Sequence, residues 1–160
     1  MIPDSAPNYE KMDIIDLTKL AYDKDDPIAQ NLLGEAYRDG FQAKQNHGVA
    51  ASLFYKAAKN KNPDALVNLG IAFAKGQGVP KNPEKARELF RIAVRDGRSS
   101  TLFKVGEVYA KGLGVRQDVE MAVLCWLRAA GVTVRADLVP QDPVSKRYLT
   151  QSLREEPKAP

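Results

Sequence analysis

The sequence predicts an all-α protein in which three antiparallel helix pairs stack into one array, with a capping helix at each end. Three observations lead to this fold class. A register of 36 residues recurs three times without insertion, its columns have helical spacing, and Asn/Asp-Pro and Gly signals mark where the helices begin and end. Internal repeats of about 20–50 residues are typical of stacked arrays.

The N-terminal segment, residues 1–26, is predicted to be an acidic cap with a helix from Tyr9 to Tyr22. It carries seven acidic residues against three Lys, a net charge of −4. The repeat register reaches back to Ile14, Leu17 and Ala21, which match the apolar positions of the second helix in a full unit. The segment therefore resembles a second helix without its own first helix, as expected of a terminal unit that closes the array.

The three full units cover residues 27–62, 63–98 and 99–131, and each is predicted to hold two helices. Dipeptides such as Asn62-Pro63 place a side-chain acceptor at the N-cap and a Pro at the first helical position. The predicted helices are 27–39 and 47–59, 63–75 and 83–95, and 99–111 and 119–130. Columns that repeat at 36 residues include Gly34, Gly70 and Gly106; Tyr37, Phe73 and Tyr109; Phe54, Phe90 and Trp126; and Ala57, Ala93 and Ala129.

Glycines in these columns have two predicted roles. In a helix interior each Gly costs about 1 kcal/mol relative to Ala, so we expect another helix to pass close to Gly34, Gly70 and Gly106. In the turns, the Gly-x-Gly-Val motif that contains Gly78 is expected to adopt positive φ. Gln42 stands at the equivalent position of the first unit, where positive φ is not expected.

After the third unit the pattern breaks. Asp142 stands where the Gly of a fourth unit would fall, and Pro140 would interrupt that helix. Residues 132–155 are therefore predicted to form a C-terminal capping segment with a different helix at about 143–155, and residues 156–160 a frayed tail.

Composition excludes several classes of protein. The chain has 160 residues and a net charge of +4, too mild to require a nucleic acid or an anionic membrane as partner. A single Cys and a single His leave no intrachain disulfide and no Cys/His metal cluster, and no cofactor is implied. No apolar stretch is long enough for a membrane span or a signal peptide. A cytoplasmic location is expected of the chain as written, and a periplasmic or secreted one if a leader has been removed.

The residues of the units resemble the Sel-one-like repeat (SLR) family, a relative of the tetratricopeptide repeat. The second unit carries the family pattern in Ala65, Leu69, Gly70, Phe73, Gly76, Gly78, Val79, Lys85, Ala86, Phe90 and Ala93. The third carries it in Gly106, Tyr109, Gly112, Gly114, Val115, Ala122, Trp126, Ala129, Ala130 and Gly131. The resemblance implies a right-handed α-solenoid of antiparallel helix pairs that binds other proteins as an adaptor, regulator or inhibitor, without catalysis of its own.

The same resemblance implies that the first helix of each unit lines a concave groove. Residues off the packing columns would then face a protein or peptide partner as an apolar strip edged with Lys. We expect this strip to comprise Ile28, Asn31, Leu32, Glu35 and Asp39; Val67, Asn68, Ile71 and Lys75; and Phe103, Lys104, Glu107 and Lys111. Exposed apolar clusters of this kind usually mark an interaction site. The competing interpretation is that the C-terminal helix folds back over them.

Other functions are weaker alternatives. A Cys125–His47 dyad is disfavoured because the two residues lie two units apart, and Cys125 occupies a core column. Asn68 and Lys104 match half of the carboxylate clamp of some tetratricopeptide proteins, but the other half is missing. The basic residues Lys44, Lys56, Lys59 and Lys61 lack stacking aromatics, which favours a solvated face over a nucleic-acid site. An immunity or inhibitor protein acting on a toxin or enzyme, and a hydrolase with an unrecognised site, stay open.

Overall fold

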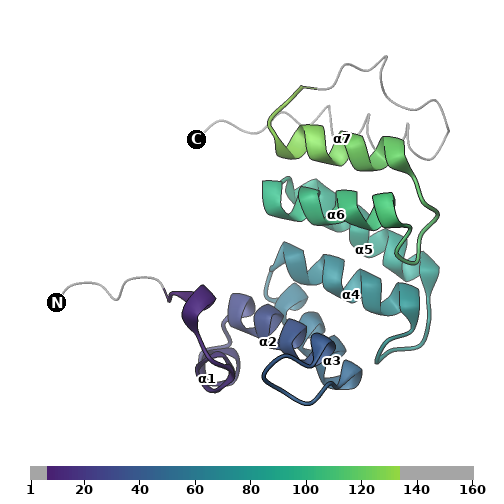
Figure 1. Ribbon diagram of the computed structural model, residues 1–160. Helices are drawn as coiled ribbons and strands as arrows, with labels where there is room; N and C mark the ends of the chain where they lie inside the picture. The colour runs from purple at the N-terminus through teal and green to yellow at the C-terminus, as the bar shows by residue number, and fades with distance from the viewer. Residues whose placement is uncertain (1–6, 134–160) are drawn as a thin grey trace.

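The computed structural model describes residues 7–133 of the chain (Figure 1). Within this range a short 3-10 turn, η1 (Tyr9–Lys11), precedes seven α-helices and no strands. The helices are α1 (Ile14–Asp23), α2 (Pro27–Asp39), α3 (His47–Lys59), α4 (Pro63–Lys75), α5 (Pro83–Asp96), α6 (Ser99–Lys111) and α7 (Val119–Ala129). These bounds agree closely with the predicted pairs. The predicted C-terminal helix at 143–155 and the tail at 156–160 lie outside the described residues.

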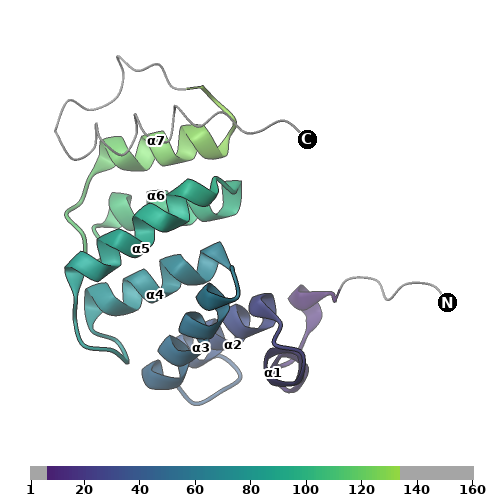
Figure 2. The same cartoon turned by 180° about the vertical axis from the view of Figure 1, so that it is seen from behind.

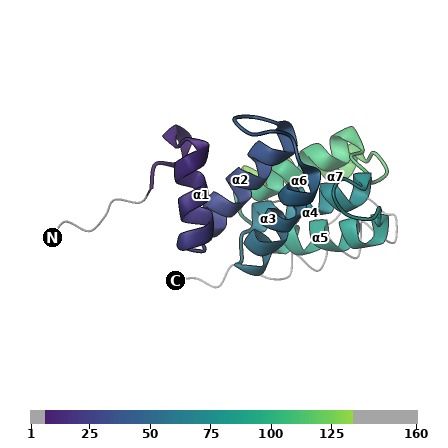
Figure 3. The same ribbon diagram turned by 90° about the horizontal axis from the view of Figure 1, so that it is seen from below.

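The pairs α2–α3, α4–α5 and α6–α7 stack from one end of the molecule to the other, as the all-α solenoid prediction requires (Figure 1). Viewed from behind, α3 and α5 lie in front of the first helices of their pairs (Figure 2). Helix α1 lies beside α2 at the N-terminal end (Figure 3). The fold is thus two layers of helices, with α1 closing one end.

Helix starts follow the predicted capping pattern. Asn46, Asn82 and Asp118 lie 36 residues apart and cap α3, α5 and α7, each accepting a hydrogen bond from the backbone N–H three residues on. Such caps satisfy backbone donors that the helix itself leaves unpaired. Helix α6 departs from this pattern, because its N-cap is Arg98 and no side chain caps it.

The mid-helix glycines allow close packing inside each pair. A Cβ at Gly34 would lie 2.6 Å from Phe54 Cε1, and one at Gly70 would lie 2.5 Å from Phe90 Cε1. At Gly106 the neighbour is the indole of Trp126. The predicted close approach is therefore confirmed, and an aromatic ring of the second helix makes the contact each time.

Apolar side chains join neighbouring pairs into a continuous core. Val67 of α4, Phe90 of α5, and Val105 and Cys125 of the third pair belong to one buried cluster. At the N-terminal end Leu17 of α1 packs in a cluster with α2 and α3 residues. Because each pair buries its apolar face against the next, the array is stabilised by neighbour contacts along its length.

The structure corrects two predictions at the N-terminal end. The predicted helix from Tyr9 to Tyr22 starts only at Ile14, because Asp13 caps it with its side chain, and the preceding turn is 3-10. Gln42 has a φ of 58°, so the first unit does use positive φ in its turn. The Gln42 side-chain oxygen accepts a hydrogen bond of 3.1 Å from the Ile14 N–H, which helps to fix the start of α1.

Candidate protein-binding face

The predicted groove residues lie on α2, α4 and α6, which together form what we call the first-helix face. They differ in exposure. Ile28, Asp39, Lys75, Phe103 and Lys111 are exposed; Leu32, Glu35, Ile71, Lys104 and Glu107 are partly buried; and Asn31, Val67 and Asn68 are buried. The expected apolar strip is therefore interrupted by buried residues that contact other parts of the array instead of solvent.

The structure corrects the prediction that Val67 lines the groove. Its side chain is 1% exposed and belongs to the core cluster with Phe90 and Val105, so it is no partner contact. Phe103 stands in the same repeat column but is 54% exposed. Position 67 faces the following unit, whose helix α6 covers it, whereas no further unit follows α6 and α7 within the described residues.

A buried amide joins α2 to α4. The Asn68 Nδ2 group donates to Asn31 Oδ1 at 2.9 Å and to Glu35 Oε1 at 2.8 Å. Asn68 Oδ1 accepts from Arg38 Nη1 at 2.9 Å. Every hydrogen-bonding group of this side chain is therefore used within the protein, as is usual for buried polar groups.

Lys104 ties the first helices of all three units together. Its Nζ lies 3.6 Å from Glu35 Oε1 on α2 and 3.2 Å from Asp64 Oδ2 on α4. Thr101 Oγ1 also donates to Asp64, at 2.7 Å. Asn68 and Lys104, the two residues that match half of a carboxylate clamp, thus already have partners inside the chain.

The remaining lysines of the face differ from each other. Lys111 Nζ pairs with Glu107 Oε1 at 3.1 Å on the exposed surface of α6. Lys75 is exposed and has no ion-pair partner among residues 7–133. Lys75 is therefore the lysine of this set whose charge is most available to a partner.

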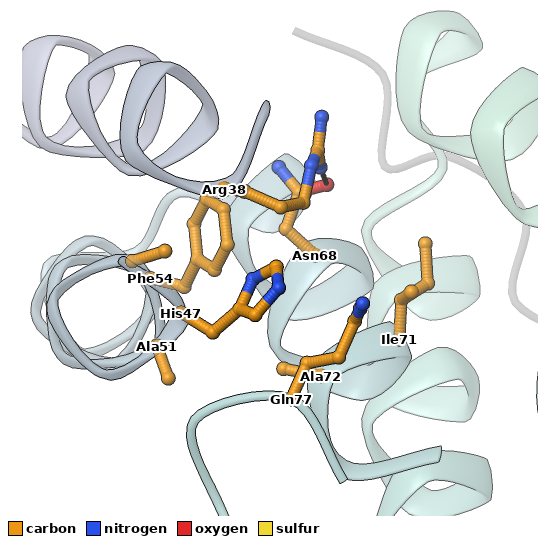
Figure 4. Close-up of a pocket in the computed structure, with 9 residues that line it drawn as sticks. Arg38, His47, Ala51, Phe54, Asn68, Ile71, Ala72 and Gln77 are labelled. Atoms are coloured by element: carbon orange, nitrogen blue, oxygen red, sulfur yellow. Dashed lines mark hydrogen bonds between the residues drawn. The ribbon is translucent and has the colours of Figure 1, made fainter. Parts of the chain in front are cut away.

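A shallow pocket opens between the first and second pairs (Figure 4). Its polar residues are Arg38, His47, Asn68 and Gln77, and its apolar wall includes Phe54, Ala51, Ile71 and Ala72. The Arg38 guanidinium forms two hydrogen bonds of 2.8 Å with the Asp39 carboxylate. These bonds lower the pKa of Asp39 and raise that of Arg38.

Most of this pocket was missed by sequence reasoning, which placed only Asn68 and Ile71 at a site. A signal was present in the repeat columns. Arg38, His47 and Gln77 stand 36 residues before Ala74, Pro83 and Leu113, so three polar residues occupy columns that are apolar one unit later.

The structure places Cys125 and His47 in different interfaces. Cys125 is buried in the cluster between the second and third pairs, whereas His47 lines the pocket between the first and second. Burial raises the pKa of the Cys125 thiol to about 12. A thiol that stays protonated at neutral pH is a poor nucleophile. The prediction of a core cysteine is thus confirmed.

Residues 7–133 contain neither a membrane-spanning helix nor a metal-binding cluster. None of the helices there is both long and apolar enough to cross a bilayer. In the same range no three His, Cys, Asp or Glu residues gather in a way that could hold a metal ion.

Stacked helix pairs with repeating Gly and aromatic contacts define the class as an α-solenoid of helix-pair repeats. The family model of the Sel1 repeat matches residues 27–62, 63–97 and 99–131. The chain belongs to the Sel1 repeat family, as its residue pattern predicted. Sel1 repeats are generally protein-interaction modules and generally non-enzymatic.

Solved structures show the same fold. A Sel1 repeat protein from Oxalobacter formigenes is 30% identical over 78% of this chain and 50% of its own, with a TM-score of 0.56. A protective antigen with an SLR fold, c5321, present in uropathogenic Escherichia coli strains, is 26% identical over 88% of this chain and 33% of its own, with a TM-score of 0.57. This chain thus spans half or less of these relatives. No curated protein matches it.

Proposed function

We propose that the protein is a non-enzymatic adaptor or regulator that binds a partner protein on its first-helix face. The observation that carries the proposal is an aromatic pair in which Phe103 is exposed and Trp126 is partly buried. The Phe103 side chain is 54% exposed, and its ring centre lies 6.0 Å from that of Trp126. The Trp126 indole N–H donates to the Phe103 carbonyl oxygen at 3.2 Å.

An aromatic pair of this kind suits protein recognition. Aromatic residues are enriched at protein interfaces and often dominate the binding energy. Because the Phe103 ring already contacts Trp126 on one side, part of its side-chain freedom is lost before a partner binds, which lowers the entropy cost of binding. Ile28, 45% exposed on α2, is a second apolar contact point at the other end of the face.

The polar centre of the face supports the same proposal. The Asn68 amide and the Lys104 ammonium already have partners within the array. A partner can therefore cover them without leaving buried polar groups unpaired, which is the usual penalty for burial. Exposed Lys75 and Lys111 at the rim would mainly affect the association rate and its salt dependence.

The proposal is tested with Phe103→Glu and a matched control, Tyr55→Glu. Tyr55 is 59% exposed on α3, in the other helix layer, so both changes place a charge at an exposed aromatic position. The tagged full chain is used to capture proteins from a lysate of its source organism. We expect one stoichiometric partner with wild type and Tyr55→Glu, and at least tenfold less of it with Phe103→Glu. Equal capture by Phe103→Glu, with thermal unfolding unchanged, would show that the partner binds elsewhere.

A further inference from the structure

One side of α7 is apolar and covered, whereas the same side of α5 is polar and exposed. Met121 and Leu124 on α7 are 7% and 5% exposed. Lys85 and Glu88, which stand 36 residues earlier on α5, are both exposed, and so is Ser52 in the Leu124 column on α3. A helix pair of this repeat therefore does not need apolar residues in these columns for its own packing.

This side of α7 faces away from α6. The Trp126 indole packs on Gly106 of α6. Leu124 precedes Trp126 by two positions, and each residue of a helix turns by about 100°, so the two side chains point to nearly opposite sides. The residues that form what we call the outer face of α7 are Met121, Leu124 and Leu127.

The described residues account for only part of this cover. Within residues 7–133, Met121 and Leu124 form a small cluster with Leu127 and Tyr109. Helix α7 is the last helix of this range, so no further unit lies over its outer face there. The remaining cover therefore comes from outside the described residues.

The chain beyond α7 has the composition of a suitable occupant. Asp142-Pro143 repeats the Asp-Pro signal that opens α2, and the sequence predicts a helix at 143–155. Two apolar pairs at i, i+4 spacing fall in this range, and such pairs are neighbours on a helix surface. They are Val144 with Tyr148, and Leu149 with Leu153.

The connection is long enough for this segment to reach α7. Residues 134–142 span at most about 30 Å when fully extended, whereas α7, with its 11 residues, is about 17 Å long. The chain leaves α7 at Ala129 and can therefore turn back along the same helix. A segment of the same chain is also present at a much higher effective concentration than a separate protein.

We propose that residues 143–155 pack on the outer face of α7 and close the C-terminal end of the array. Terminal units of such arrays present a polar outer side to water, and the segment gives α7 that side by covering its apolar residues. Phe103, 54% exposed on α6, lies outside the covered face and stays available to a partner. The proposal does not rest on the proposed function, because it concerns contacts within one chain.

Hydrogen exchange of the full-length protein, followed by mass spectrometry, tests the proposal. A short helix that packs on nothing exchanges its amides almost as fast as an unfolded chain, because isolated helices of this length are marginal in water. We expect peptides from 143–155 to exchange at least tenfold more slowly than that. Leu124→Ser and Met121→Lys introduce the residues found in the same columns at positions 52 and 85, and each should remove this protection.

Val123→Arg is the matched control. Val123 is 41% exposed on α7 and stands in the column of the exposed Arg87, so this change adds a polar residue outside the outer face. It should leave the exchange of 143–155 unchanged, and peptides from α2 to α5 should exchange as in wild type in every variant. Should Leu124→Ser loosen α7 itself, Leu149→Ser decides, because it leaves α7 intact and should speed exchange in both the segment and α7.

Three outcomes would overturn the proposal. Exchange of 143–155 at the unfolded rate in wild type would mean that another chain covers the outer face, and protection that grows with protein concentration would assign the cover to a second copy. Protection that is lost in Phe103→Glu but kept in Leu124→Ser would place the segment on the first-helix face. No partner protein enters this experiment, so its result and that of the capture experiment are judged separately.

Discussion

Replacing Gly78 by Ala should destabilise the protein far more than replacing Gly97 by Ala. Both glycines have positive φ, 74° at Gly78 and 76° at Gly97. Their surroundings differ. A Cβ at Gly78 would collide with the His47 carbonyl and the Gly48 nitrogen, whereas a Cβ at Gly97 would meet only Arg128 Nη2, at 3.6 Å. Comparing the two variants therefore separates the free-energy cost of positive φ in a residue with a side chain from the cost of a steric collision.

The magnitudes follow from these surroundings. A left-handed conformation costs an L-residue about 1–2 kcal/mol, and this is the whole effect expected at Gly97. Asp25 and Lys61 occupy the equivalent positions of earlier units with φ of 52° and 65°, which shows that this turn accepts a side chain. At Gly78 the backbone of the first unit must also move, and overpacking adds about 1–3 kcal/mol. We expect losses of about 1–2 kcal/mol for Gly97→Ala and about 2–5 kcal/mol for Gly78→Ala.

The assay is equilibrium unfolding in urea, followed by far-UV circular dichroism on wild type and both variants under identical conditions. The free energy of unfolding is taken from the midpoint and slope of each curve. Losses that agree within about 0.5 kcal/mol would refute the argument, since differences of that size are typical of surface changes. They would mean that the turn at Gly78 does not rest on the first unit.

Two further predictions concern ionisable groups. Hydrogen bonding to Arg38 lowers the pKa of Asp39, so its contribution to stability is present at neutral pH and is lost as the pH falls through the lowered value. The difference in unfolding free energy between wild type and Asp39→Asn should therefore be constant near pH 7 and shrink below about pH 4, and a difference independent of pH would contradict this. Because burial raises the pKa of Cys125 to about 12, a thiol reagent at pH 8 should react at least ~100-fold more slowly with the native protein than with the urea-unfolded chain. Equal rates would place the thiol at the surface.

Helices were predictable because their signals are local. N-caps such as Asn62 and Asn82, the prolines that follow them, and the terminal glycines each depend on a few neighbouring residues. Because the unit occurs three times, most of these signals recur in the chain at the same spacing. The column of positive φ at Asp25, Lys61 and Gly97 was missed, because two of its three residues are not glycine.

Gln42 shows why a local signal can mislead. At the equivalent position Gly78 is forced to be Gly by the backbone of the unit before it. The first unit has only α1 before it, and there a side chain is accommodated and bonds to the Ile14 N–H. Gln42 can therefore stand where the second unit has Gly78 because no complete unit precedes the first one. The turn itself is the same, since both residues have positive φ.

The sequence by itself determined the repeat, the helix bounds, the close approach of a second helix to Gly34, Gly70 and Gly106, and the family. Only the tertiary structure decided which residues of the first helices are exposed. Val67 and Phe103 share a column, yet one is buried and the other exposed, because exposure depends on whether a further unit covers that side. Likewise Lys104 meets Glu35 across two units, a contact between residues 69 positions apart that no local pattern encodes. Helix formation depends on neighbours along the chain, whereas a binding surface depends on neighbours in space.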